Sequence, residues 1–180
     1  MKATGIVRRV DMLGRVVIPK ETRNTLKINY GDPIEIYTDK DEIILKKYSP
    51  VLNIEGVSKN VAETLEKITG HSAIVCDKDV YVSAAGGGVK TFVGKNVSQE
   101  VEKVLGQRKT LLVNSADGGT PLSLLDGEES PFPNQLLTPI TADYEVVGAI
   151  ILASKNGEDK ITSLDAQMAT LAAEFVGANV

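Results

Sequence analysis

The sequence is poor in residues on which several classes of protein depend. Its single cysteine cannot form an internal disulfide bond, and its single histidine cannot build a metal site with several histidine ligands. Tryptophan is absent and aromatic residues make up 4% of the chain, which argues against stacking platforms for single-stranded nucleic acid. Hydrophobic residues make up 42% of the 180 residues, so we expect folded structure in one domain or two small ones.

Long apolar runs are also missing. The longest, Val146 to Ala153, is interrupted by Gly148 and is far shorter than the ~18 residues that a membrane span needs. The first ten residues, MKATGIVRRV, lack the apolar segment of a secretory signal. We therefore expect a cytoplasmic protein with no membrane partner.

Charge is distributed unevenly along the chain. Residues 1–27 carry seven Lys or Arg against two Asp or Glu, a net charge of +5, whereas residues 28–48 carry −2 and residues 49–180 carry −7. A basic end on an acidic body indicates that the front of the chain meets a polyanion such as nucleic acid. The alternative is that these small excesses of charge only reflect ordinary solvent-exposed faces.

The chain is expected to divide near Ser49-Pro50, because a residue before proline disfavours helix and commonly marks a boundary. We predict a first domain at 1–50, a linker at 51–55 and a second domain at 56–178. In the first domain the pattern predicts strands at Gly5–Val10 and Arg15–Ile18, a short helix from Pro19 to about Leu26, and a hairpin of Ile34–Thr38 with Glu42–Tyr48. The helix presents a polar, mostly basic stripe of Lys20, Arg23, Asn24 and Lys27.

About fifty residues is a marginal size for an independent core. In the two predicted strands at the front, apolar residues occupy both odd and even positions, so both faces of each strand need to be covered. We infer that two copies interlock and share one core; the alternative is that the second domain of the same chain covers these strands. A pair would carry +10 at its front and could neutralise about six to eight phosphates, which gives steep salt dependence.

The stretches TGIVRRVDMLGRVVIPKETRNTLKI and GDPIEIYTDKDEIILKKY, which cover essentially residues 3–48, resemble the AbrB family of swapped-hairpin transcription factors. The resemblance implies an interlaced dimeric β-barrel that binds double-stranded DNA through basic residues on one face. Arg8, Arg15 and Arg23 match family positions linked to DNA contact, and we expect Arg9 and Asn24 to add to them. Asn24 departs from the family, where a second arginine is common; it can donate a hydrogen bond but has no charge.

The same barrel also resembles the DNA-binding part of some antitoxins. Those proteins usually continue into a disordered tail that wraps a toxin. Here the continuation has the length and apolar content of a folded domain, so an antitoxin is the weaker alternative.

The second domain is predicted to be α+β with a mostly antiparallel sheet. We expect a helix from Ser58 to Gly70, strands at 72–76, 80–84, 110–114, 135–140 and 146–153, a helix at 98–105 and a last helix from Thr162. The stretch TPITADYEVVGAIILAS resembles the central hairpin of GAF domains. That resemblance implies a unit for oligomerisation or for sensing a small-molecule ligand, whose identity the sequence does not reveal; no known cofactor is expected.

The last helix is apolar over a wide arc. Its face is predicted to be Leu164, Met168, Leu171 and Phe175, with Ala169, Ala172, Ala173 and Val176 beside it. We expect this helix and the one containing Val61 to build a subunit interface that turns the dimer into a homotetramer; alternatively, both helices lie flat on their own sheet.

Motifs for catalysis are weak. Gly86-Gly87-Gly88 is not followed by the Gly-Lys-Ser/Thr of a phosphate loop, and no G-x-S-x-G occurs. His71 has no second ligand at metal-binding spacing, and Cys76 is expected to be a buried small hydrophobe. We therefore expect no enzyme and no metal site.

The fold class predicted is α+β, a swapped-hairpin dimeric β-barrel followed by a GAF-like domain. The combination resembles regulators of sporulation genes, and we interpret the chain as a sequence-specific DNA-binding activator and repressor of such genes. The alternatives are a small-molecule sensor, or an antitoxin-like protein, whose front end mainly dimerises.

Overall fold

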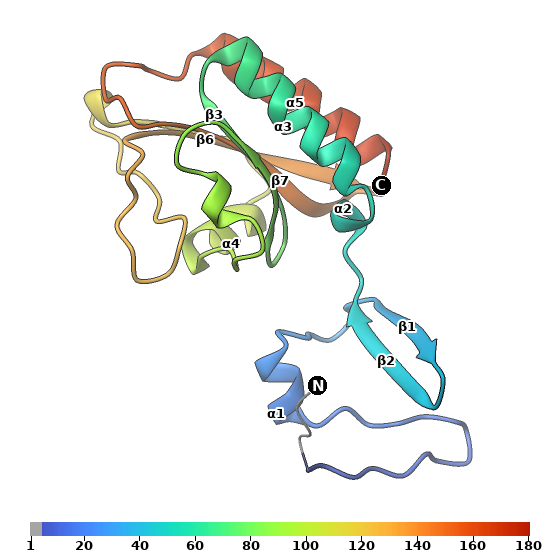
Figure 1. The fold of residues 1–180 in the computed structure, drawn as a ribbon. Coiled ribbons are helices and arrows are strands. Elements are labelled where there is room, and N and C mark those ends of the chain that lie inside the picture. The colour runs from blue at the N-terminus through green and yellow to red at the C-terminus, as the bar shows by residue number, and fades with distance from the viewer. Residues whose placement is uncertain (1–4) are drawn as a thin grey trace. The chain divides into compact units, whose positions relative to one another are not determined.

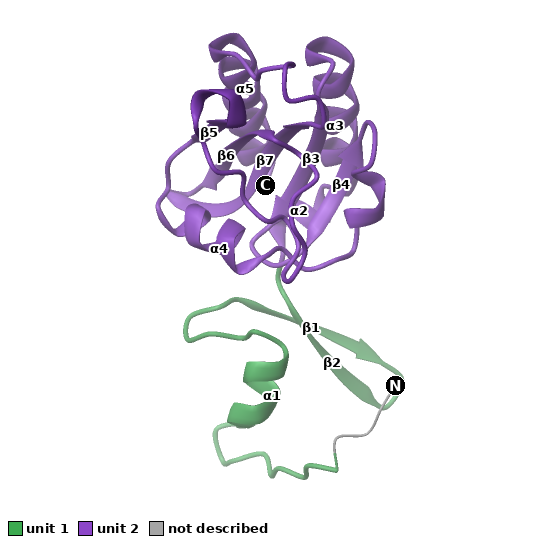
Figure 2. Ribbon diagram, turned by 90° about the vertical axis from the view of Figure 1, so that its left-hand side faces the viewer, with its two compact units in different colours: residues 1–48 green, residues 49–180 purple. Residues whose placement is uncertain are grey.

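Two parts of the chain fold separately in the computed structural model, which describes residues 5–180. Residues 1–48 form the first unit and residues 49–180 the second (Figure 2). Among residues 5–180, no helix has the length and apolar character that crossing a membrane would require.

The first unit contains a short helix and a hairpin. Helix α1, Lys20–Thr25, follows Pro19, whose fixed φ suits a helix start. Strands β1, Ile34–Asp39, and β2, Glu42–Lys47, pair antiparallel with Ile34 opposite Lys47 and Asp39 opposite Glu42. The predicted helix and the predicted hairpin are both confirmed.

Residues 5–10 and 15–18 differ from the prediction, because they form no strand in the single chain. Between them, Asp11 and Arg15 bracket a turn in which the Asp11 amide donates to the Arg15 carbonyl at 3.0 Å. A strand needs a neighbouring backbone with which to form its ladder of hydrogen bonds. Within one chain the apolar side chains here stay uncovered, and Val7 and Val17 are 85% and 72% exposed.

The second unit is built on a five-stranded sheet in the order β4-β3-β7-β6-β5. All four neighbouring pairs are antiparallel, as the sequence predicted. The central hairpin is β6 with β7, joined by a tight turn at Asp143 and Tyr144, which both have positive φ. The strands are β3, Ser72–Asp77; β4, Tyr81–Ala85; β5, Leu111–Asn114; β6, Asn134–Ala142; and β7, Glu145–Ser154.

Helices cover both faces of this sheet, and each face has its own hydrophobic core. Figure 1 shows α3, Glu55–Thr69, and α5, Ser163–Ala178, side by side on one face, and α4, Gln99–Gly106, on the other. The core under α3 and α5 includes Ile150 and Leu152 of β7, whereas the core under α4 includes Ile151, since side chains alternate along a strand. Short 3₁₀ turns occur at Lys90–Phe92 and Ser115–Asp117.

Residues 51–55, predicted to be a linker, lie within the second unit of the structure. Pro50–Asn53 form a short helix, α2, which Ser49 caps by accepting from the Leu52 amide at 3.2 Å, and Val51 is completely buried. Ser49-Pro50 therefore begins a helix, because proline is favoured at the first helical position. Ser58, predicted to begin α3, instead lies buried inside it.

Candidate nucleic-acid interface

The five predicted contact residues lie on three local elements of the first unit. Arg8 and Arg9 precede the turn, Arg15 follows it, and Arg23 and Asn24 belong to α1. All five are exposed. Because none of these side chains is used in packing, the arrangement can present positive charge to a polyanion.

The turn at residues 11–15 is organised by the side chain of Asp11. Its Oδ1 accepts hydrogen bonds from the amides of Leu13 and Arg15, both at 2.9 Å. Its Oδ2 accepts one from Arg15 Nε at 2.8 Å. Hydrogen bonds from the backbone and from the side chain of Arg15 hold the pKa of Asp11 below its usual value.

The sequence did not reveal that Asp11 contacts Arg15, because an acidic residue in a basic segment only lowers the net positive charge of that segment. The signal that could have revealed it is the spacing Asp-x-x-Gly-Arg. Gly14 has a positive φ of 75°, which glycine adopts without strain, and this lets the chain return toward Asp11.

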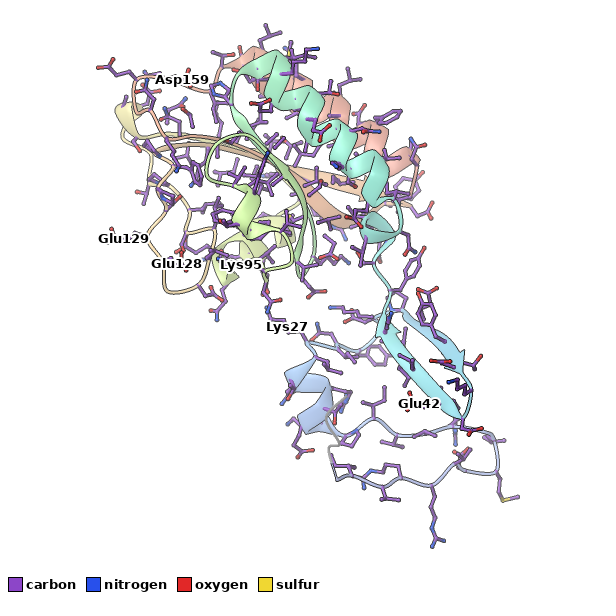
Figure 3. The ribbon with its side chains drawn as sticks, viewed as in Figure 1. Lys27, Glu42, Lys95, Glu128, Glu129 and Asp159 are labelled. Atoms are coloured by element: carbon purple, nitrogen blue, oxygen red, sulfur yellow. The ribbon has the colours of Figure 1, made fainter. Side chains whose placement is uncertain are left out.

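Helix α1 is anchored at its C-terminal end. Lys27 has a positive φ of 50°, and its carbonyl accepts a hydrogen bond from Lys47 Nζ at 3.0 Å. Lys47 also forms an ion pair with Asp32 at 3.2 Å. Since Lys47 ends β2, this contact ties the helix of Arg23 to the hairpin; Lys27 is marked in Figure 3.

The second unit has a different character at its helix face. Ala169, Ala173, Val176 and Gly177 of α5 are buried, whereas Leu164, Leu171 and Phe175 are exposed. The predicted apolar face therefore points outward and the small residues face the sheet. A Cβ at Gly177 would collide with the Thr141 carbonyl, so α5 lies against β6 at a distance that only a small residue allows.

His71 lies at the end of α3, next to Gly70, whose left-handed conformation closes the helix. The ring is buried, with Nδ1 3.2 Å from Asp159 and Nε2 3.6 Å from Asp165. Asp165 also forms a capping box with Thr162 at the start of α5. His71, at the end of α3, therefore lies close to Asp165 near the start of α5.

A pocket of about 520 Å³ opens beside α4. Two of its carboxylates are held by backbone amides, Glu100 by Ser123 at 2.8 Å and Asp126 by Gln99 at 3.0 Å. Such a lining repels phosphate. Among the described residues, no group of three or more His, Cys, Asp or Glu could hold a metal ion. The acidic residues of the pocket are Glu100, Asp126, Glu128 and Glu129, the last two of which are marked in Figure 3.

Models of known protein families match both units. The family model described as "Stage V sporulation protein T C-terminal, transcription factor" matches residues 53–180. The model described as "Antidote-toxin recognition MazE, bacterial antitoxin" matches residues 7–53.

Individual relatives agree with these matches. Stage V sporulation protein T of Bacillus subtilis (strain 168) is 43% identical over 157 residues, covering 87% of this chain and 86% of that protein. The transition state regulatory protein AbrB of the same strain is 49% identical over 75 residues, covering 42% of this chain and 77% of that protein.

The fold of the second unit has solved counterparts. The GAF domain of Acinetobacter phosphoenolpyruvate-protein phosphotransferase superposes with a TM-score of 0.59 at 12% identity, covering 74% of this chain and 83% of that one. At this identity the likeness concerns the fold alone, and it confirms a GAF-like α+β fold for the second unit. The AbrB-like character of the first unit is supported by the matches to AbrB and to the MazE model. With the model match over residues 53–180 and the relative at 43% identity, the chain belongs to the stage V sporulation protein T family of transcription factors.

Proposed function

We propose that the first unit binds double-stranded DNA as an intertwined dimer, with Arg8, Arg15 and Arg23 making the principal contacts and Arg9 and Asn24 adding to them. The observation that supports this most is the net charge of +5 on residues 1–27, with all five of these side chains exposed. Arginine suits the task because its planar guanidinium can bond a phosphate or a guanine edge with two N–H groups.

The proposed dimer would cover the apolar residues that are exposed in the single chain. Burying a valine side chain stabilises by roughly 1.5–3 kcal/mol, and Val7, Val10, Val16 and Val17 are all exposed in the single chain. A second copy would also supply the backbone that residues 5–10 and 15–18 need to form strands. Two copies bring three arginines each, which makes six principal contacts per dimer.

The second unit is proposed to join two dimers. Leu164, Leu171 and Phe175 of α5 and Ile68 of the neighbouring α3 form an exposed apolar surface, which is unusual unless something covers it. Pairing this surface with its copy would give a homotetramer. Two DNA-binding dimers in one particle bind separated sites more tightly through their effective concentration.

As a member of its family, the chain is a regulator of sporulation genes. We infer that it activates some and represses others from the cytoplasm, without catalysing a reaction. The GAF-like unit is proposed to respond to a small-molecule ligand, so that ligand binding changes how the dimers are held.

The test is a fluorescence-anisotropy titration of a labelled duplex with the full chain. With six phosphate contacts, affinity should fall about 1,000-fold between about 50 and 200 mM salt. Each single Arg→Ala change removes two contacts per dimer and should reduce the salt slope by about two units. A duplex affinity that does not change with salt would reject DNA binding through these arginines.

A second candidate function is an antitoxin, which the match of residues 7–53 to the MazE model favours. Such a protein would co-purify with a toxin at a fixed ratio. The sheet and helices of residues 49–180 form their own hydrophobic cores, so this part of the chain is a folded domain and not a tail that wraps a toxin, and we prefer the regulator.

A further inference from the structure

We infer that Asp11 is a positioning residue for Arg15, and that it makes DNA binding more selective for sequence at the expense of non-specific attraction. This inference rests on the proposed DNA binding and goes beyond it, because it gives an acidic residue a part in recognition. No other part of the chain is needed for the contact, since all of its atoms lie within residues 11–15.

The two oxygens of the carboxylate have separate tasks. Oδ1 accepts the amides of Leu13 and Arg15 and so fixes the turn, while Oδ2 accepts Arg15 Nε. The Asp11 carbonyl accepts the Gly14 amide at 3.0 Å, which closes the same turn. Asp11 is thus held by the backbone before it meets Arg15.

This anchoring separates the pair from an ordinary surface ion pair. Exposed pairs usually contribute little, because two long flexible side chains must both be ordered. Here the carboxylate is short and already fixed, so only the arginine must be ordered. The Arg15 side chain remains 70% exposed and that of Asp11 42% exposed, so the guanidinium stays accessible to DNA.

The position of the contact on the guanidinium decides what remains for DNA. Arginine has five N–H donors, one on Nε and four on the terminal nitrogens. Because Asp11 accepts from Nε, this contact leaves the two terminal nitrogens for a two-point contact with a base edge or a phosphate. A restrained side chain also loses less conformational entropy when DNA binds.

The negative charge acts in the opposite direction on non-specific binding. Asp11 offsets the charge of Arg15, so the turn attracts phosphates less than a free arginine would. Loss of Asp11 should therefore strengthen binding to DNA of mixed sequence while weakening the preference for a selected site. A residue that only stabilised the turn would weaken both.

The experiment compares Asp11→Asn with the unchanged full chain. Asparagine keeps an oxygen for the two backbone amides but loses the charge that holds Arg15. The probes are one duplex obtained by in vitro selection with the unchanged chain and one mixed-sequence duplex of equal length. Glu21→Gln, an exposed position in the first turn of α1, is the control for the same change in net charge.

We expect the ratio of selected to mixed-sequence affinity to fall about tenfold or more in Asp11→Asn, the size of one lost base contact. Glu21→Gln should leave the ratio unchanged. In an Arg15→Lys background, which keeps the charge but has no Nε, Asp11→Asn should have no further effect on the ratio. If thermal unfolding shows that Asp11→Asn is destabilised, Asp11→Ser, which also keeps an oxygen for the turn, replaces it.

An unchanged ratio in Asp11→Asn would overturn the inference, as would an equal loss in the Arg15 and Lys backgrounds. The proposed DNA binding would fail differently, through the absence of salt-dependent binding in the unchanged chain.

Discussion

The exposed apolar surface of α5 permits a sharp test of the tetramer through Leu171→Glu. Leu171 is 70% exposed in the single chain. Full burial of a leucine side chain is worth roughly 1.5–3 kcal/mol, so covering this fraction contributes about 1–2 kcal/mol per copy. A two-fold interface contains the residue twice, which makes about 2–4 kcal/mol and about 30- to 1,000-fold in the dissociation constant. A buried, unpaired glutamate would add to this loss.

Sedimentation velocity of the full chain over a dilution series measures the effect. The unchanged chain should sediment as a tetramer and Leu171→Glu as a dimer with unchanged circular dichroism. Thr170→Glu adds the same charge at a neighbouring exposed position off the apolar stripe and should remain tetrameric. If Leu171→Glu and Thr170→Glu dissociate alike, or if the unchanged chain never exceeds a dimer, the proposed use of this surface is wrong.

Three further predictions concern the second unit. Burial raises the pKa of Cys76 to about 12, so the native thiol should not react with a thiol reagent at pH 8 but should react fully in denaturant; rapid native labelling would contradict its burial. Burial raises the pKa of Asp165, but hydrogen bonds from Thr162 and the nearby His71 outweigh this effect and leave the pKa lowered. The stabilisation of the fold by the Asp165 carboxylate is therefore present above pH 3.8 and is lost as the pH falls through the pKa of the folded state. Asp165→Asn should therefore lower the melting temperature at pH 7 and reduce its loss between pH 5 and 2, and an identical pH profile would refute this. A Cβ at Gly148 would collide with the Cys76 carbonyl. Gly148→Ala should therefore lower the free energy of unfolding, measured by urea titration, by about 1–3 kcal/mol, and an unchanged midpoint would disprove this.

Elements with strong local signals could be predicted from the sequence. Thr162 ahead of an apolar run predicted the start of α5, and the structure has a capping box there. The β6–β7 hairpin followed from two apolar runs around Asp143 and Tyr144. Gly70 marked the end of α3 because glycine adopts the left-handed cap.

Elements that depend on distant partners could not be predicted in this way. Residues 5–18 have strand-like composition, but a strand forms only where another backbone pairs with it, and one chain does not provide it. The sequence indicated that α5 is apolar over more than one side, but it did not show which residues face the sheet. The alanines do, because β6 approaches closely at Gly177, and Leu164, Leu171 and Phe175 are exposed.

The candidate site shows the same division. Charge counting found the basic front of the chain, and the resemblance to the AbrB family singled out Arg8, Arg15 and Arg23 within it. It could not find the link between Asp11 and Arg15, because that link is a matter of hydrogen-bond geometry across a turn. The DNA contacts of the arginines stay a prediction.

The central claim is that paired first units present Arg8, Arg15 and Arg23 to one DNA duplex. The most direct measurement is the salt dependence of duplex binding by a triple variant, with each of these arginines changed to alanine, that circular dichroism and sedimentation show to be folded and still dimeric. Loss of six contacts per dimer should reduce the salt slope by about five units and abolish binding at physiological salt. Binding by this variant with the affinity and slope of the unchanged chain would contradict the claim.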